Sequence, residues 1–199
     1  MKLESLTLTG SHIRLEPLGP QHASDLADAA TDQRTWTYLD EPQPWTRATV
    51  DRFVSEAQAE QLTGRRIPFA IVERSSEQAV GSTSYLDIRA HDRGVEIGWT
   101  WLAPVVWNSG VNTEAKYLLL SHAFDAGAIR VAIKTDRRNE RSQRAIEALG
   151  ATREGVWRNR RVLSTGAYRD TVYYSIIDSE WPAVREHLQT RLARRTTTL

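Results

Sequence analysis

The sequence predicts a mixed α/β (α+β) domain with a central, mostly antiparallel sheet of six to seven strands flanked by helices. Strand and helix patterns follow one another in the order β-α-α-β-β-β-α-β-α-β-β-α. Three consecutive strands with short polar connections, between residues 67 and 102, indicate an antiparallel meander. The strand–helix–strand unit between residues 95 and 135 requires a parallel crossover. The sheet is therefore expected to be mixed.

Length and composition limit the class of protein. The 199 residues fit a single domain, 1–199. The 26 basic and 25 acidic residues give a net charge of +1, which does not predict a nucleic-acid partner. The absence of cysteine excludes disulfides and thiolate catalysis. No apolar run approaches the ~20 residues of a membrane span, and the start MKLESLTLTG lacks the apolar core of a signal peptide. A cytoplasmic protein without a membrane partner is expected.

The N-terminal part predicts one strand and two helices. Leu6–Leu18 alternates as a strand does, and Pro20 opens a helix to about Ala30. A second helix is expected over Thr46–Leu62 because its apolar residues recur at helical spacing.

Between these helices, the segment Thr31–Trp45 predicts a loop or a broken helix. It carries Trp36 and Tyr38 as well as Pro42 and Pro44. Its aromatic rings are expected either to cap the core or to contact a substrate, and the residues give equal weight to both interpretations.

The stretch Trp99–Phe124 organises the chain. A strand breaks at Pro104, passes through a loop at Gly110 and becomes a helix that ends near Ala126. The first amides of a helix have no internal partner, and the helix dipole adds positive charge there. The stretch therefore predicts an anion site for a phosphate-bearing cofactor.

The remaining elements complete the sheet. They are expected as a meander of Ile67–Glu73, Val80–Arg89 and Val95–Leu102, then strand Ile129–Thr135, helix Asn139–Leu149, strands Thr152–Arg160 and Arg169–Ile177, and a final helix from Ser179. Residues 191–199 are expected to fray.

Three motifs carry a resemblance over nearly the whole chain. They are EIGWTWLAPVVWNSGVNTEA (Glu96–Ala115), RNERSQRAIEALGATREGVWRNRRV (Arg138–Val162) and YRDTVYYSI (Tyr168–Ile176). The chain resembles the GNAT acyltransferase superfamily, and more narrowly the branch that includes the ribosomal-protein N-terminal acetyltransferases. The resemblance implies a GNAT fold whose sheet is splayed at the coenzyme site. It also implies transfer of an acetyl group from acetyl-CoA to a primary amine, of a protein N-terminus or a small molecule, by direct attack in a ternary complex. Members of this branch often form homodimers.

The resemblance also implies the coenzyme site. The pyrophosphate is expected on backbone amides of Asn108–Thr113, and the pantetheine along Trp101–Val106. The implied coenzyme-binding residues are Trp101, Leu102, Ala103, Val105, Val106, Asn108, Ser109, Gly110, Val111, Asn112, Thr113, Asn139 and Ser142. The chain departs from the superfamily pattern at Trp107, where Gln or Arg is usual, and at Asn112, where Gly or Ala is usual. Asn112 is expected to adopt a positive φ or to cap the helix.

The same resemblance implies two catalytic residues. Glu96 would take the proton of the attacking amine, directly or through water, and Ser142 would donate to the departing thiolate. Structural interpretations stay open for both: Glu96 paired with Arg89 or Arg93, and Ser142 as part of a helix cap with Asn139.

The acceptor is the least defined part. The substrate-site candidates are Trp36, Tyr38, Tyr85 and Asp87. The segments Thr31–Trp45 and Arg158–Tyr168 are expected to select the amine. The five histidines show no metal-ligand spacing, so no metal is expected. Two alternatives remain open: a non-catalytic acyl-CoA-binding sensor or interaction module of the same fold, and transfer of a longer acyl group.

Overall fold

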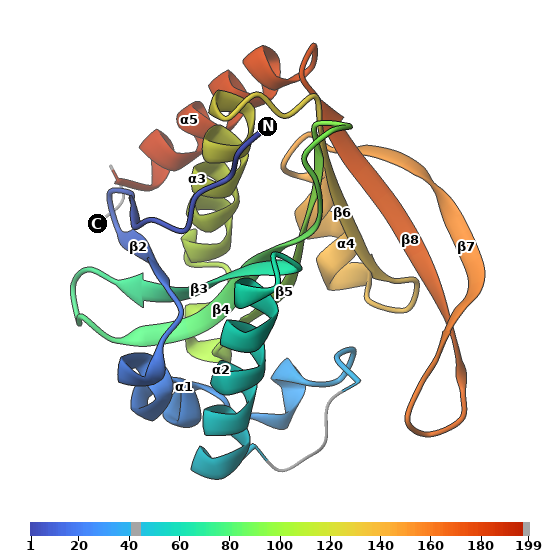
Figure 1. The fold of residues 1–199 in the computed structure, drawn as a ribbon. Helices are drawn as coiled ribbons and strands as arrows, with labels where there is room; N and C mark the ends of the chain where they lie inside the picture. Colours follow the sequence, from blue (N-terminus) through green and yellow to red (C-terminus); the bar gives the residue numbers. More distant parts are fainter. Residues whose placement is uncertain (41–44, 197–199) are drawn as a thin grey trace.

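The computed structural model describes residues 1–40 and 45–196 (Figure 1). Its sheet has the strand order β1-β2-β3-β4-β5-β6-β8-β7. The strands are β1 (Leu8–Thr9), β2 (Ile13–Pro17), β3 (Arg66–Glu73), β4 (Ala79–Arg89), β5 (Gly94–Leu102), β6 (Arg130–Asp136), β7 (Thr152–Val162) and β8 (Tyr168–Ile177). Neighbouring strands are antiparallel except β5 and β6, which are parallel. The predicted fold class, the meander and the parallel crossover are confirmed.

Eight strands replace the expected six to seven within the described residues, because the first predicted strand is two strands. A tight turn separates β1 from β2, with Gly10 N donating to Ile13 O at 2.9 Å. A Cβ on Gly10 would overlap the carboxylate of Glu114, which accepts hydrogen bonds from the Ser11 and His12 amides. A side chain at this position would therefore displace the Glu114 carboxylate from these amides.

Five α-helices lie in the described part of the chain: α1 (Ala23–Ala29), α2 (Arg47–Leu62), α3 (Val111–Asp125), α4 (Glu140–Glu147) and α5 (Trp181–Thr196). Short 3-10 turns lie at Pro20–His22 (η1), Gln33–Thr35 (η2) and Pro104–Val106 (η3). The expected fraying from Arg191 was wrong as far as Thr196, since α5 continues to that residue. Arg191 anchors this last part by donating to the Ala148 carbonyl at 2.5 Å. Pro42 and Pro44 lie outside the described residues.

The sheet has a hydrophobic core on each face. Helices α3, α4 and α5 cover one face, and α1 and α2 cover the other (Figure 1). Val95 and Ile97 of β5 belong to the first core, whereas Trp101 of the same strand belongs to the second. In a regular strand, residues 95, 97 and 101 would all lie on the same face. The change of face therefore requires an extra residue in β5.

That extra residue forms a β-bulge at the centre of the sheet. Gly98 pairs with Ser84 and Trp101 with Ser82, so two residues of β5 oppose Thr83 alone. Trp99, inside the bulge, has φ +49°, a strained conformation for a bulky side chain. Pairing between β5 and β6 ends just before it, at Ile97 with Ile133. The two parallel strands separate beyond this point, which confirms the predicted splay.

None of the helices in the described residues has the length and apolar character of a membrane span.

Candidate active site

The predicted pyrophosphate loop ends at the N-terminus of α3. Gly110 is the N-cap residue with φ +104°, and Asn108 before it has φ +62°. The first helical bond runs from Glu114 N to Gly110 O at 2.9 Å, and the described residues give the earlier amides of Asn112 and Thr113 no acceptor. These amides and the helix dipole fit an anion. The expectation for Asn112 was wrong: it lies inside α3, and Gly110 has both the positive φ and the cap position.

Two arginines flank this loop and were missed in the sequence. The Arg141 guanidinium, on α4, lies 3.4 Å from the centre of the Trp107 ring, and that of Arg34 lies 5.6 Å from it. The Trp107 indole is itself held by a hydrogen bond to Leu102 O at 3.0 Å. The unusual Trp107 was the available signal, because tryptophan is the preferred aromatic partner of arginine. The two arginines place positive charge next to the α3 N-terminus.

The other predicted coenzyme residues form the edge of the splay and the turn after it. Leu102 ends β5, and η3 follows directly. Trp101, Leu102, Ala103 and Val106 are buried, whereas Val105 is 87% exposed. The Trp101 side chain packs into the α1–α2 core, so only its backbone can face the splay. The Ser109 hydroxyl donates to Val106 O at 2.6 Å and is used within the turn.

Glu96 lies at the closed end of the splay, where β5 and β6 still pair. It is 6% exposed, and its Oε2 lies 2.7 Å from Lys134 Nζ on β6. The ion-paired interpretation of Glu96 therefore holds with a different partner, since Arg89 pairs with Asp87 and Arg93 donates to Gly127 O. Burial raises the pKa of the Glu96 carboxyl, and Lys134 opposes that rise. A buried carboxylate with a raised pKa suits proton abstraction near neutral pH.

Ser142 lies in the first turn of α4, the helix that follows β6. The Asn139 side chain caps this helix by accepting from Ser142 N at 3.0 Å. The predicted capping role of Asn139 is confirmed. The Ser142 hydroxyl has no hydrogen-bond partner among the described residues and is half-buried. It therefore can donate to a ligand in the splay.

The four substrate-site candidates are not brought together. Tyr85 is fully buried beneath α3 and donates to Leu119 O at 2.5 Å, so its assignment to the substrate site was wrong. Trp36 is 4% exposed, and its indole donates to Ala30 O at 2.8 Å, which supports the core-capping interpretation. Tyr38 is half-buried near Arg138 and Arg141. Asp87 is exposed, and its charge contributes to the raised pKa of Glu96.

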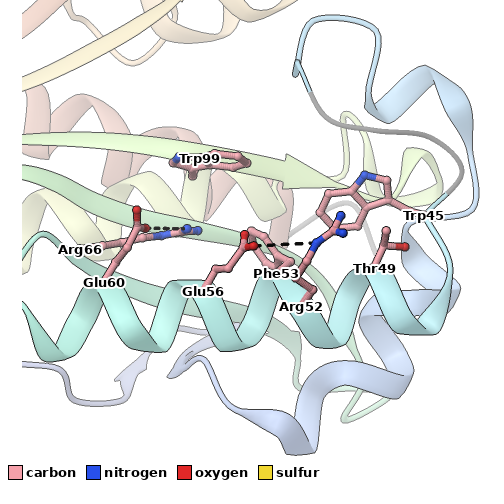
Figure 2. A pocket seen from close by; sticks show the side chains of 8 residues that line it. All are labelled: Trp45, Thr49, Arg52, Phe53, Glu56, Glu60, Arg66 and Trp99. Atoms are coloured by element: carbon pink, nitrogen blue, oxygen red, sulfur yellow. Dashed lines mark hydrogen bonds and ion pairs between the residues drawn. The ribbon is translucent and has the colours of Figure 1, made fainter. Parts of the chain in front are cut away.

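A cavity of about 410 Å³ lies between α2 and the bulge of β5 (Figure 2). The lining side chains are Trp45, Thr49, Arg52, Phe53, Glu56, Glu60, Arg66 and Trp99. The Arg66 guanidinium is 5.2 Å from the Phe53 ring centre and 5.1 Å from that of Trp99, and Arg66 also pairs with Glu60. Two arginines and two glutamates balance one another, and the rest of the lining is mostly aromatic. We refer to this cavity as the α2 pocket.

The two segments expected to select the acceptor touch each other. Asp40, after the 3-10 turn η2, accepts hydrogen bonds from the Ser164 amide (3.0 Å) and hydroxyl (2.7 Å) at the tip of the β7–β8 hairpin. Arg161 of the same hairpin lies 3.6 Å from Asp40. The contact joins two parts of the chain 124 residues apart. The described residues contain no group of three or more His, Asp or Glu side chains that could hold a metal ion.

Comparisons with known proteins agree with this geometry. Residues 12–152 match the family model of the acetyltransferase (GNAT) domain. A structure of a GCN5-related N-acetyltransferase from Brucella melitensis superposes with a TM-score of 0.88 at 30% identity, covering 94% of this chain and 85% of the other. The chain belongs to the GNAT acetyltransferase family.

Two further relatives are more distant or match over a shorter length. The "Putative ribosomal N-acetyltransferase YdaF" of Bacillus subtilis is 33% identical over 102 residues, which are 51% of this chain and 55% of YdaF. The chain spans between half and two thirds of the curated relatives it matches. Mycobacterium smegmatis RimJ in complex with CoA-disulfide shares the fold, with a TM-score of 0.77 at 21% identity, over 94% of this chain and 91% of RimJ.

Proposed function

We propose that the protein is an N-acetyltransferase that uses acetyl-CoA as donor and the primary amine of a protein N-terminus as acceptor. The observation that carries this proposal is the splay between β5 and β6. The N-terminus of α3, capped by Gly110, follows the open end of β5, and the buried carboxylate of Glu96 lies where β5 and β6 still pair. A thioester bound between these two ends would meet the amine beside Glu96.

The donor side uses backbone amides and arginines. The amides of Val111, Asn112 and Thr113 would hold the pyrophosphate, and Arg34 and Arg141 would add charge for the coenzyme phosphates. Bound acetyl-CoA supplies the activated acetyl group. The CoA complex of RimJ supports this choice of donor.

The acceptor side uses the opposite face of β5. The α2 pocket lies beside Trp99, three residues from Glu96, and has room for the side chain next to the attacking amine. Its balanced charge and aromatic lining suit an N-terminal residue better than a polyamine, which needs an excess of carboxylates. The name of YdaF as a ribosomal N-acetyltransferase supports a protein acceptor.

The chain's own residues then take one proton from the attacking ammonium and stabilise the charge that develops. Glu96 accepts a proton from the ammonium, directly or through water, so that the nitrogen lone pair can attack the thioester carbonyl carbon. Backbone N–H groups near Trp101 and Leu102 would stabilise the oxyanion. Ser142 would donate a hydrogen bond to the sulfur as the carbon–sulfur bond breaks. The nitrogen then gives its second proton to the thiolate, so the products are an N-acetyl amide and the free thiol, and the first proton is left on Glu96.

The test is turnover with a panel of amines. Purified protein is incubated with acetyl-CoA and N-terminal peptides, polyamines or aminoglycosides, and thiol release is followed by a chromogenic disulfide. We expect release with peptides that depends on the peptide's free α-amine, with N-acetylated peptides as the matched control. Tight CoA binding without release for any amine would contradict the proposal and favour the sensor alternative.

A further inference from the structure

Lys116 of α3 is a buried lysine that reaches the central sheet. The residue is 4% exposed. Its Nζ donates to the hydroxyl of Thr100 on β5 at 2.5 Å and to that of Thr83 on β4 at 3.4 Å. The two hydroxyls lie 2.7 Å from each other. One side chain thus connects the helix to both strands at the bulge.

In the described part of the chain, the lysine has no acidic partner. Among the described residues, no Asp or Glu forms an ion pair with Lys116, although Glu114 is close in sequence and instead accepts from the Ser11 and His12 amides. Burial lowers the pKa of the Lys116 ammonium to about 7. An apolar side chain would fill the same space without this desolvation penalty. Lys116 therefore differs from a leucine or methionine at this position through the hydrogen bonds that it donates, and not through its volume.

Thr100 lies between the bulge of β5 and the open edge of that strand. Thr100 follows Trp99, the strained residue of the bulge, and precedes Trp101 and Leu102 at the open edge of β5. Beyond Ile97 that edge has no pairing with β6 to fix its direction. Lys116 also lies less than two helical turns after Gly110, which is at the proposed pyrophosphate site. Its hydrogen bond to Thr100 therefore connects the start of α3 to the part of β5 beside the proposed thioester site.

We propose that Lys116 is a positioning residue for acetyl transfer. It holds the β5 bulge against α3, so that the backbone of Trp101 and Leu102 keeps the orientation that stabilises the oxyanion. Lys116 acts through Thr100 and touches no substrate. This inference rests on the proposed function, since the oxyanion exists only if the splay binds a thioester.

The experiment compares the full wild-type chain with four single variants and one double variant. Lys116→Met keeps the volume and removes the donor. Thr100→Val removes the hydroxyl at constant shape, whereas Thr100→Ser keeps a hydroxyl. Ser121→Ala, on the same helix, is the matched control because it removes a hydroxyl that contacts none of these residues. Each protein is assayed for kcat, for KM of the acceptor, and for the Kd of coenzyme A.

We expect Lys116→Met and Thr100→Val each to lower kcat about tenfold, because a backbone donor that is out of place weakens transition-state binding. The Kd of coenzyme A, which lacks the reacting carbonyl, should stay within about twofold, as should the acceptor KM. Thr100→Ser should retain most of the wild-type kcat that Thr100→Val loses. The Lys116→Met/Thr100→Val double variant should be no slower than either single variant, because both remove one connection.

Three results would overturn the inference: a kcat for Lys116→Met within about twofold of wild type, a parallel loss of coenzyme A affinity, or additive effects in the double variant. A wild-type protein without turnover would instead refute the proposed function. In that event, hydrogen exchange decides on the connection itself. Amides of residues 98–103 should exchange at least about fivefold faster in Lys116→Met while β8 is unchanged, and equal rates would refute it.

Discussion

Two buried ionisable side chains lie on opposite faces of β5. Glu96 lies on the α1–α2 face of β5 and pairs with Lys134, whereas Lys116 approaches Thr100 from the α3 face. Burial raises the pKa of the acid and lowers that of the base, so both move toward neutrality. Buried groups whose pKa values are perturbed in this way are candidates for functional sites.

Glu96 gives the first prediction at the residue scale. Glu96→Gln should lower kcat about a hundredfold, because the amide cannot accept the ammonium proton. In the wild type, the rate should fall as pH drops through the raised pKa of Glu96. Lys134→Met removes the charge that opposes this rise and should move the acidic limb of the rate profile to higher pH. The measurement is kcat/KM against pH; an unmoved limb would exclude Glu96 as the titrating base.

Lys116 gives a second prediction, on stability. Between pH 7 and 10.5 the unfolded chain keeps its lysine protonated while the folded amine is neutral. The unfolded state then binds one more proton, so stability rises with pH in this window, and below pH 7 the contribution is constant. From pH 7 to 9 the free energy of unfolding should rise by about 2 kcal/mol more in wild type than in Lys116→Met. Denaturant titrations check this, and parallel curves would contradict it.

At the element scale, the β5 bulge and the start of α3 together create the donor site. The bulge turns Trp101 to the other face of the sheet and comes directly after the last β5–β6 pair. Gly110 then provides the positive φ that lets the chain enter α3 with its amides directed outward. Neither feature depends on a side chain that reacts.

Gly110→Ala tests this backbone role. A Cβ at φ +104° strains the loop, so the Kd of coenzyme A should rise about tenfold. Gly64→Ala is the matched control: Gly64 has φ +71° with open space around a Cβ, and it lies at the end of α2. It should lose stability of about 1 kcal/mol and keep its coenzyme affinity. Equal losses of affinity in the two variants would exclude a direct role for Gly110.

The contact between the Asp40 segment and the β7–β8 hairpin gives the acceptor prediction. Asp40→Ala removes the acceptor of the Ser164 hydrogen bonds and should free the hairpin tip. We expect the KM of the peptide to rise about fivefold while the Kd of coenzyme A is unchanged, because the loss of these exposed charge-assisted contacts loosens the acceptor side only. Steady-state kinetics with varied peptide check this. A change in coenzyme affinity alone would place the contact on the donor side.

At the scale of the whole molecule, local patterns were sufficient for most of the fold. Periodicity predicted the elements from α2 to β8, and the Gly110 loop predicted an anion site, because both depend on neighbouring residues. The sequence did not reveal the Glu96–Lys134 pair or the stacking of Arg141 on Trp107, since each joins residues more than thirty positions apart. Tyr85 was misassigned because strand position does not say which face a helix will cover.

In the proposed function, the splay between β5 and β6 binds acetyl-CoA for transfer to an amine. A crystal structure of the wild-type protein grown with coenzyme A tests this binding mode most directly. We expect the pyrophosphate on the amides of Val111–Thr113 and the sulfur inside the splay, between Glu96 and Ser142. Coenzyme bound outside the splay, or β5 and β6 paired beyond Ile97 so that the splay is closed, would contradict it.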